Sequence, residues 1–97
     1  MIRHIVLWAF GDGVPPAERD AIAAAIRALP EKVPSLRMLE VGENVGRAGA
    51  KGYTYGAVAT FDDRDGLAAY LAHPDHAPVG ARLRAAAARI LVADLEV

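Results

Sequence analysis

Two of the three histidines lie in one short segment together with a tyrosine, in the run Tyr70-Leu71-Ala72-His73-Pro74-Asp75-His76. Histidine is the side chain whose unperturbed pKa lies near neutral pH, so it can take up and release protons under physiological conditions. Side chains of this kind are few in the chain and are gathered here. The segment therefore indicates acid–base chemistry at a site for a small molecule.

Each of these side chains also has a purely structural interpretation, and the sequence leaves it open. His76 could cap a helix or hydrogen-bond a loop, Tyr70 could pack a helix against a sheet, and His73 is expected to fix the loop by a side-chain hydrogen bond. A divalent metal on His73, Asp75 and His76 is disfavoured, because a proline separates the histidines and no third ligand lies nearby in the sequence. We predict neither a metal nor a cofactor.

The segments that must position these residues follow from hydrophobic spacing and from turn and capping residues. Strands are expected at His4–Phe10, Met38–Glu43, Tyr53–Phe61 and Ile90–Val97, with helices from Pro16 to Pro30, from Asp63 to Ala72 and from Pro78 to Ala88. The order is strand, helix, strand, strand, helix, strand, with the second helix interrupted at the histidine segment. This order predicts one α+β domain over residues 1–97, with a ferredoxin-like antiparallel sheet and helices on one face.

The first strand is apolar on both sides, because side chains alternate between the two faces of a strand. One face carries His4, Val6, Trp8 and Phe10, and the other carries Ile5, Leu7 and Ala9. A chain of 97 residues can supply helices for only one of these faces. We therefore predict a homodimer in which the bare sheet faces of two copies meet, with an apolar pocket between the two sheets.

The residues expected to line this pocket are His4, Val6 and Trp8 on the first strand and Tyr53, Tyr55 and Ala57 on the third. Small alanines beside tyrosines could leave space for a ligand. Packing alone explains these residues equally well.

Composition excludes several classes of function. A net charge of -1 offers no positive field for nucleic acid, and the absence of cysteine excludes thiolate chemistry. No apolar run reaches about 18 residues, so we expect no membrane partner and a cytoplasmic location. Ser35, the only serine, lies beside a proline with no basic neighbour, which disfavours serine hydrolase chemistry.

The chain resembles the stress-responsive dimeric α/β-barrel (Dabb) domain family along almost its whole length. The matching features are His4-Ile5-Val6-Leu7, Gly42 and Asn44, Gly52-Tyr53, Ala57-Val58-Ala59-Thr60-Phe61, Tyr70 with His73-Pro74-Asp75-His76, and Val92-Ala93-Asp94. The resemblance implies a ferredoxin-like subunit and a homodimeric barrel.

The family includes plant polyketide cyclases that close a ring by an aldol-type reaction without metal or organic cofactor. The resemblance implies that His76 and Tyr70 are catalytic and that His4 lines the site. His76 would remove a proton beside a carbonyl group, and the Tyr70 hydroxyl would donate to the carbonyl oxygen. This chain has Tyr55 where the plant enzymes have a further histidine. It has Ile22, Ala23 and Ile26 where their first helix carries bulky aromatics, so the shape of its pocket must differ.

Two functions from different classes follow. The first is a homodimer that binds a small, apolar, carbonyl-bearing molecule and, if it is an enzyme, performs cofactor-independent proton transfer or ring closure. The alternative is a non-catalytic structural or stress-protective assembly whose interior is filled by Trp8, Phe10 and the tyrosines. A monooxygenase or isomerase is a third hypothesis, which rests on fold analogy alone.

Overall fold

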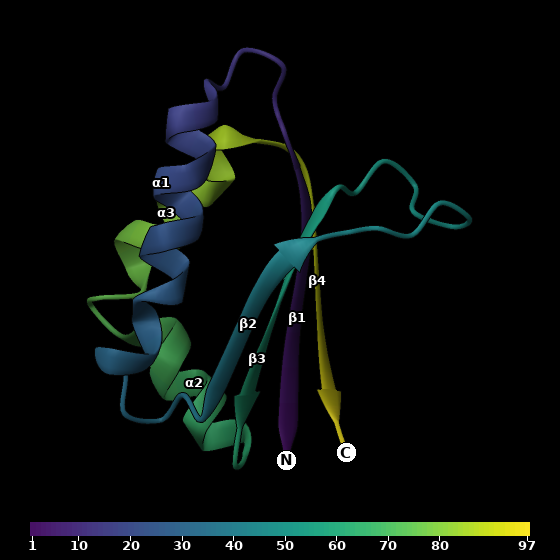
Figure 1. The fold of residues 1–97 in the computed structure, drawn as a ribbon. Helices are drawn as coiled ribbons and strands as arrows, with labels where there is room; N and C mark the ends of the chain where they lie inside the picture. Colours follow the sequence, from purple (N-terminus) through teal and green to yellow (C-terminus); the bar gives the residue numbers. More distant parts are fainter.

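The computed structural model describes residues 1–97 as one four-stranded sheet with its helices on a single face (Figure 1). The elements are β1 (Ile2–Phe10), α1 (Pro16–Arg27), the short 3-10 helix η1 (Leu29–Glu31), β2 (Met38–Glu43), β3 (Tyr55–Phe61), α2 (Arg64–Ala72), α3 (Ala77–Ala86) and β4 (Ala87–Glu96). The strands lie in the order β2-β3-β1-β4, and each neighbouring pair is antiparallel. The predicted ferredoxin-like fold is confirmed. No helix is both long enough and apolar enough to cross a bilayer.

The end of the last helix differs from the prediction. The helix α3 stops at Ala86, and Ala87 already has an extended backbone opposite Phe10 of β1. Pairing with the central strand β1 overrides the helical preference of the alanine run, because each residue of β4 gains a partner in the sheet. The strand β4 therefore begins at Ala87, three residues earlier than predicted. The third strand begins at Tyr55, two residues later than predicted.

The face of β1 that carries His4 lies under the helices. His4, Trp8 and Phe10 are each less than 10% exposed, and the neighbouring positions are more open. They pack against α1 and α3, where Ile22 is fully buried and Leu83 is 7% exposed. The sequence left open which face of β1 the helices would cover, and the structure assigns them to the His4 face.

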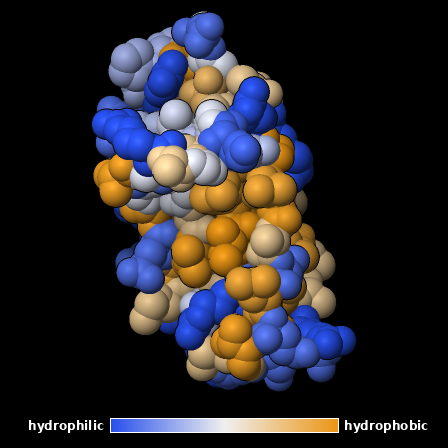
Figure 2. All heavy atoms as spheres, turned by 90° about the vertical axis from the view of Figure 1, so that its right-hand side faces the viewer, coloured by the Kyte–Doolittle hydropathy of each residue, from blue (hydrophilic) through white to orange (hydrophobic).

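The opposite face of the sheet has no helix over it, as Figure 1 shows. Leu7 on β1 pairs with Leu91 on β4, and both side chains point to this bare face. Leu91 is 48% exposed and Leu95 is 49% exposed. Figure 2 shows apolar side chains gathered over the middle of the side of the molecule opposite the helices. A lone chain therefore leaves an apolar sheet surface in water.

The start of α2 is fixed by a side-chain cap, as the sequence predicts. The backbone of Asp63 is extended, and its carboxylate accepts a hydrogen bond of 2.8 Å from the Gly66 N–H. This bond satisfies one of the N–H groups that the first turn of a helix leaves unpaired. The cap thus sets where the helix that carries Tyr70 begins.

Loss of this cap should weaken the fold measurably. Asp63→Ala is expected to lower the free energy of unfolding by about 1 kcal/mol, because the Gly66 N–H loses its acceptor. Asp63→Asn keeps a side-chain oxygen and should stay close to the parent protein. Asp65→Ala, in the same helical turn but without a capping bond, serves as a second control in urea unfolding. Equal stability of Asp63→Ala and Asp63→Asn would contradict the assignment.

Candidate functional site between the sheet and the helices

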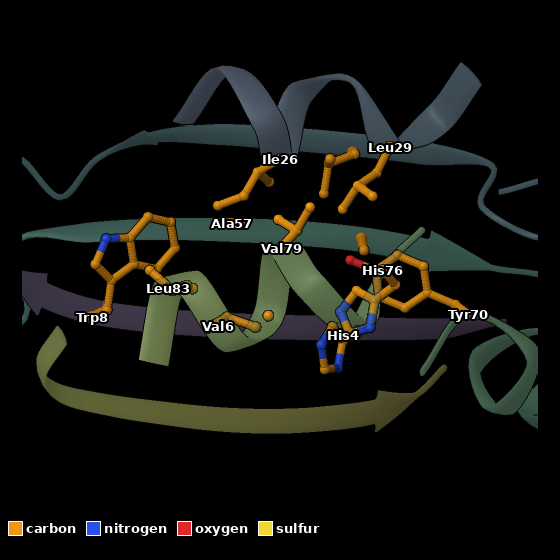
Figure 3. A pocket seen from close by; sticks show the side chains of 13 residues that line it. His4, Val6, Trp8, Ile26, Leu29, Ala57, Tyr70, His76, Val79 and Leu83 are labelled. Atoms are coloured by element: carbon orange, nitrogen blue, oxygen red, sulfur yellow. The ribbon is translucent and has the colours of Figure 1, made fainter. Parts of the chain in front are cut away.

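A cavity lies between the sheet and the helices of one chain (Figure 3). Its floor is formed by β1 and β3, where His4 is opposite Ala59 and Val6 is opposite Ala57. The small alanine side chains leave room that the helices do not fill. The cavity volume open to a water-sized atom is about 50 Å³, so a larger ligand requires side chains at its mouth to move. The cavity is lined by His4, Val6, Trp8, Ile26, Leu29, Leu39, Ala57, Ala59, Tyr70, His76, Val79, Gly80 and Leu83.

The position of this cavity corrects one prediction. We expected a pocket between the sheets of two subunits, lined by the bare face. The structure places His4, Val6 and Trp8 on the helix-covered face of β1, so the cavity that they line is roofed by helices of the same chain. Ten of the thirteen lining residues are hydrophobic. The polar groups inside it are therefore few and easily identified.

The break between α2 and α3 brings Tyr70 and His76 together. Pro74 cannot continue α2, and His73 before it takes the extended backbone that a following proline favours. The chain then turns, with the His76 N–H donating to the His73 carbonyl at 3.0 Å. The ring centroids of Tyr70 and His76 lie 4.2 Å apart. The two residues that resemblance singled out as catalytic thus lie side by side at one end of the cavity.

Tyr70 combines a packing role with a free polar group. Its ring is 4% exposed and lies 5.0 Å from the Phe61 ring, so it holds α2 against the sheet as the structural interpretation predicts. Its hydroxyl makes no hydrogen bond to the protein, and Figure 3 shows the oxygen directed into the cavity. Burial raises the pKa of Tyr70 to about 12. The group is therefore protonated at neutral pH and can donate a hydrogen bond.

His76 is the N-cap residue of α3, yet its side chain does not cap the helix. Its Nδ1 is buried and has no hydrogen-bond partner. Burial lowers the pKa of His76, and the nearby Leu71 carbonyl, which favours the protonated form, only partly offsets this. The imidazole is thus neutral at physiological pH, as a general base must be. The His76 side chain thus does not cap α3, and its polar contact is with the Leu71 carbonyl of α2.

His4 is held by an acidic residue that sequence analysis did not select. Asp94 lies directly opposite His4 in the β1–β4 register, and its Oδ1 is 2.5 Å from the His4 Nδ1. A carboxylate at Nδ1 fixes the ring and places the proton on that nitrogen, which leaves Nε2 free to accept a proton. The two residues are 90 positions apart, so only the pairing of the first and last strands reveals them as partners.

Trp8 closes the other end of the cavity. Its side chain is 1% exposed, and Figure 3 shows it opposite the cluster of His4, Tyr70 and His76. The indole carbons face the cavity, and Nε1, which has no hydrogen-bond partner, is turned away from that cluster. The cavity therefore has one polar end and one aromatic end.

Two residues predicted to line the pocket lie outside this cavity. The Tyr55 ring stacks on Trp8, with centroids 6.0 Å apart, and packs against Phe10. It thus supports the wall formed by Trp8 from behind. Tyr53 precedes β3 and lies beneath the Arg89 guanidinium, 5.8 Å from its ring centroid. Its position before the strand, where the chain has left the sheet, keeps it away from the helices.

The remaining candidates have structural partners. The His73 Nδ1 accepts a hydrogen bond of 3.1 Å from the Asp75 N–H, which confirms that His73 fixes the loop. Arg82 pairs with Glu18 at 2.5 Å. No three histidine, aspartate or glutamate side chains lie close enough together to hold a metal ion.

Several lining residues have no signal in the sequence that marks them as part of a site. They are the aliphatic residues Leu29, Leu39, Val79 and Leu83 and the glycine Gly80. Their spacing is that of any buried helix or strand face. Whether such a face fills the core or borders a cavity depends on what lies opposite.

Comparisons with known proteins agree with this architecture. The model of the stress responsive A/B barrel domain (Dabb) matches residues 2–97. The uncharacterized protein SCO4036 of Streptomyces coelicolor is 36% identical over 99% of both chains. A dimeric ferredoxin-like protein of unknown function from Thermobifida fusca is 32% identical, with a TM-score of 0.85 over 99% of this chain and 90% of that one.

A third protein shares the fold at lower identity. The hydroxynitrile lyase of Passiflora edulis is 21% identical, with a TM-score of 0.93 over 99% of this chain and 92% of that one. The match of the family model over nearly all residues, with the identity to SCO4036, is decisive. The chain belongs to the stress responsive A/B barrel domain (Dabb) family.

Proposed function

We propose that this protein binds a small, mostly apolar carbonyl compound in the cavity and catalyses a cofactor-independent proton transfer on it. One observation carries the proposal: at one end of an apolar cavity the rings of Tyr70 and His76 lie 4.2 Å apart, and the buried His76 Nδ1 has no hydrogen-bond partner. A buried polar group without a partner costs about 1–3 kcal/mol. A ligand that offers an acceptor to Tyr70 and an acidic C–H to His76 would recover that cost.

The proposed step uses both groups in their neutral forms. The Tyr70 hydroxyl donates to the carbonyl oxygen, and the neutral His76 imidazole takes the proton from the adjacent carbon. The C–H bond breaks, an N–H bond forms, and the electron pair moves to the oxygen as an enolate. The imidazolium can return the proton to carbon. Alternatively, the enolate carbon attacks a second carbonyl and closes a ring, and the imidazolium gives its proton to the alkoxide that forms. His4, oriented by Asp94, is a third polar group beside the reacting atoms.

A protein of known activity with the same fold also supports an enzymatic function. The Passiflora edulis protein is a lyase built on the same fold. The scaffold alone fixes no reaction, since many folds host unrelated activities. The reaction class is therefore argued from the paired groups in the cavity.

We further infer that two copies pair through their bare sheet faces. Leu7, Leu91 and Leu95 form the apolar surface that the helices leave uncovered. The relative from Thermobifida fusca, at 32% identity, is described as dimeric. Pairing would remove this surface from water, at roughly 25 cal/mol for each Å² of apolar area buried. Such a dimer keeps each cavity on the outer, helix-covered side of its own sheet.

A non-catalytic assembly is the second candidate, and one observation favours it. The rings of Trp8, Phe10 and Tyr55 pack against one another and fill the end of the core beyond the cavity. If the protein only binds or protects, substitutions at Tyr70 and His76 change stability or affinity but no reaction rate. A cytoplasmic location stays a prediction from the sequence.

Proton transfer can be tested on a simple ketone. The protein should accelerate exchange of the α-protons of benzylacetone with deuterated water, followed by proton NMR. His76→Ala should reduce the accelerated rate by roughly 100- to 10,000-fold, and Tyr70→Phe by roughly 100- to 1,000-fold. His73→Ala is the matched control, because that histidine only fixes the loop, and should retain the activity. An unchanged rate in His76→Ala would refute the assignment of the base.

The same exchange should depend on pH in a defined direction. Because burial lowers the pKa of His76, more than half of the imidazole is neutral at pH 6.5, where an exposed histidine is half protonated. The midpoint of the fall in rate on acidification should therefore lie below pH 6.5. A midpoint at or above pH 6.5 would place the base in a different environment.

The dimer can be tested with two equivalent substitutions. Leu91→Lys places a charge on the bare sheet face and should shift the protein from dimer to monomer in sedimentation velocity at micromolar concentration. Leu71→Lys makes the same change at a similarly exposed leucine on α2, on the helix side, and should leave the dimer intact. A parent protein that sediments as a folded monomer would rule out the dimer.

A further inference from the structure

We propose that the cavity selects uncharged carbonyl compounds that have an apolar, preferably flat, end, and that it rejects carboxylates of the same shape. The inference rests on the proposed function, because it assigns a ligand class to the same site. It adds the charge of the ligand and its direction in the cavity, with the carbonyl at Tyr70 and the apolar end at Trp8.

The charge of the ligand is inferred from the absence of charged side chains among the residues that line the cavity. No lysine, arginine, aspartate or glutamate is among the thirteen lining residues. The nearest acidic partner of a lining residue is Asp94, and its carboxylate is engaged by His4. The cation near the polar end is Arg84, which lies beside Gly80 and His76 but is exposed to water. A bound carboxylate would therefore lose its hydration, at a cost of several kcal/mol, for an interaction with a solvated guanidinium that is worth about 1 kcal/mol or less.

The polar groups in the cavity do not compensate for a negative charge. His76 is neutral because burial lowers its pKa, and Tyr70 offers one hydroxyl proton. One neutral donor suits a carbonyl oxygen, whereas a carboxylate needs several donors or a cation. A ligand cation fares no better, since the Asp94 carboxylate lies behind His4. An uncharged ligand avoids both the cost of burying an anion and the cost of burying a cation.

The direction of the ligand follows from β1. His4, Val6 and Trp8 are alternate residues on one strand face, so the cavity runs along the strand with Val6 midway. Four residues of extended strand separate the Cα atoms of His4 and Trp8 by about 13 Å, which is an upper limit for the length between the polar and the aromatic ends. Ile26 and Leu83 provide aliphatic walls between them, as Figure 3 shows. A flat apolar group can stack on the indole carbons of Trp8.

Trp8 also reports binding directly. It is the only tryptophan of the chain and lines the cavity, so its fluorescence follows occupancy without any turnover. The test compares benzylacetone with hydrocinnamate, in which a carboxylate oxygen replaces the methyl group next to the carbonyl. Near neutral pH, benzylacetone should bind at least about 10-fold more tightly, with calorimetry as a second measurement.

A pair of alanine variants locates the binding. Ala57→Leu fills the floor of the cavity and should weaken benzylacetone binding by about 10-fold or more, since the ligand competes with the added side chain. Ala81→Leu adds the same group on the exposed side of α3 and should bind benzylacetone like the parent protein. Equal binding by both alanine variants would place the ligand elsewhere and overturn the inference.

The outcomes separate this inference from the proposed function. Equal or tighter binding of hydrocinnamate overturns the ligand class, while proton exchange on benzylacetone can still succeed. Selective binding of the ketone without exchange supports the ligand class and refutes catalysis. If neither benzylacetone nor hydrocinnamate binds, both the ligand class and the proposed function are overturned.

Discussion

The alternation of side chains along β1 is the constraint on which the rest of the structure depends. One row of this strand is sealed by helices and the other is left bare. The sealed row places His4, Val6 and Trp8 along the floor of a cavity, and the bare row leaves Leu7 on an apolar surface. A shift of one residue in the register of β1 would exchange these two surfaces. The cavity proposed as a ligand site and the predicted dimer contact therefore lie on opposite sides of the same strand.

The polar groups of the cavity are unusual because the fold provides partners for only some of them. His4 has Asp94, whereas the Tyr70 hydroxyl and the His76 Nδ1 have none. Buried polar groups in proteins are nearly always hydrogen-bonded, so the unpaired His76 Nδ1 is a position where a ligand could supply the missing partner. The helix break at Pro74 creates this arrangement, because it turns the chain so that two rings from successive helices meet. The structural and functional interpretations of Tyr70 are therefore compatible, because its ring packs against Phe61 while its hydroxyl makes no hydrogen bond to the protein.

Membership of the Dabb family fits this division of the molecule into a scaffold and a site. The scaffold is shared with relatives from bacteria and plants, including one described as dimeric and one named as a lyase. The site depends on fewer positions, and small changes in them alter the cavity. Ala57 and Ala59 leave space on β3, and Tyr55 fills the region beyond Trp8. Function within this family is therefore best argued from such residues, because the fold alone permits many activities.

The sequence by itself determined the elements, the ferredoxin-like order and the family, because hydrophobic spacing, the Asp63 cap and the proline break are local signals. It also selected Tyr70 and His76, since both lie in one short segment. It did not determine which face of β1 the helices cover, so it misplaced the pocket between two subunits. Only the tertiary structure decided that, and only the pairing of β1 with β4 joined His4 to Asp94 across 90 positions. Contacts between distant segments depend on how elements pack, and an apolar row has the same appearance in the sequence whichever partner covers it.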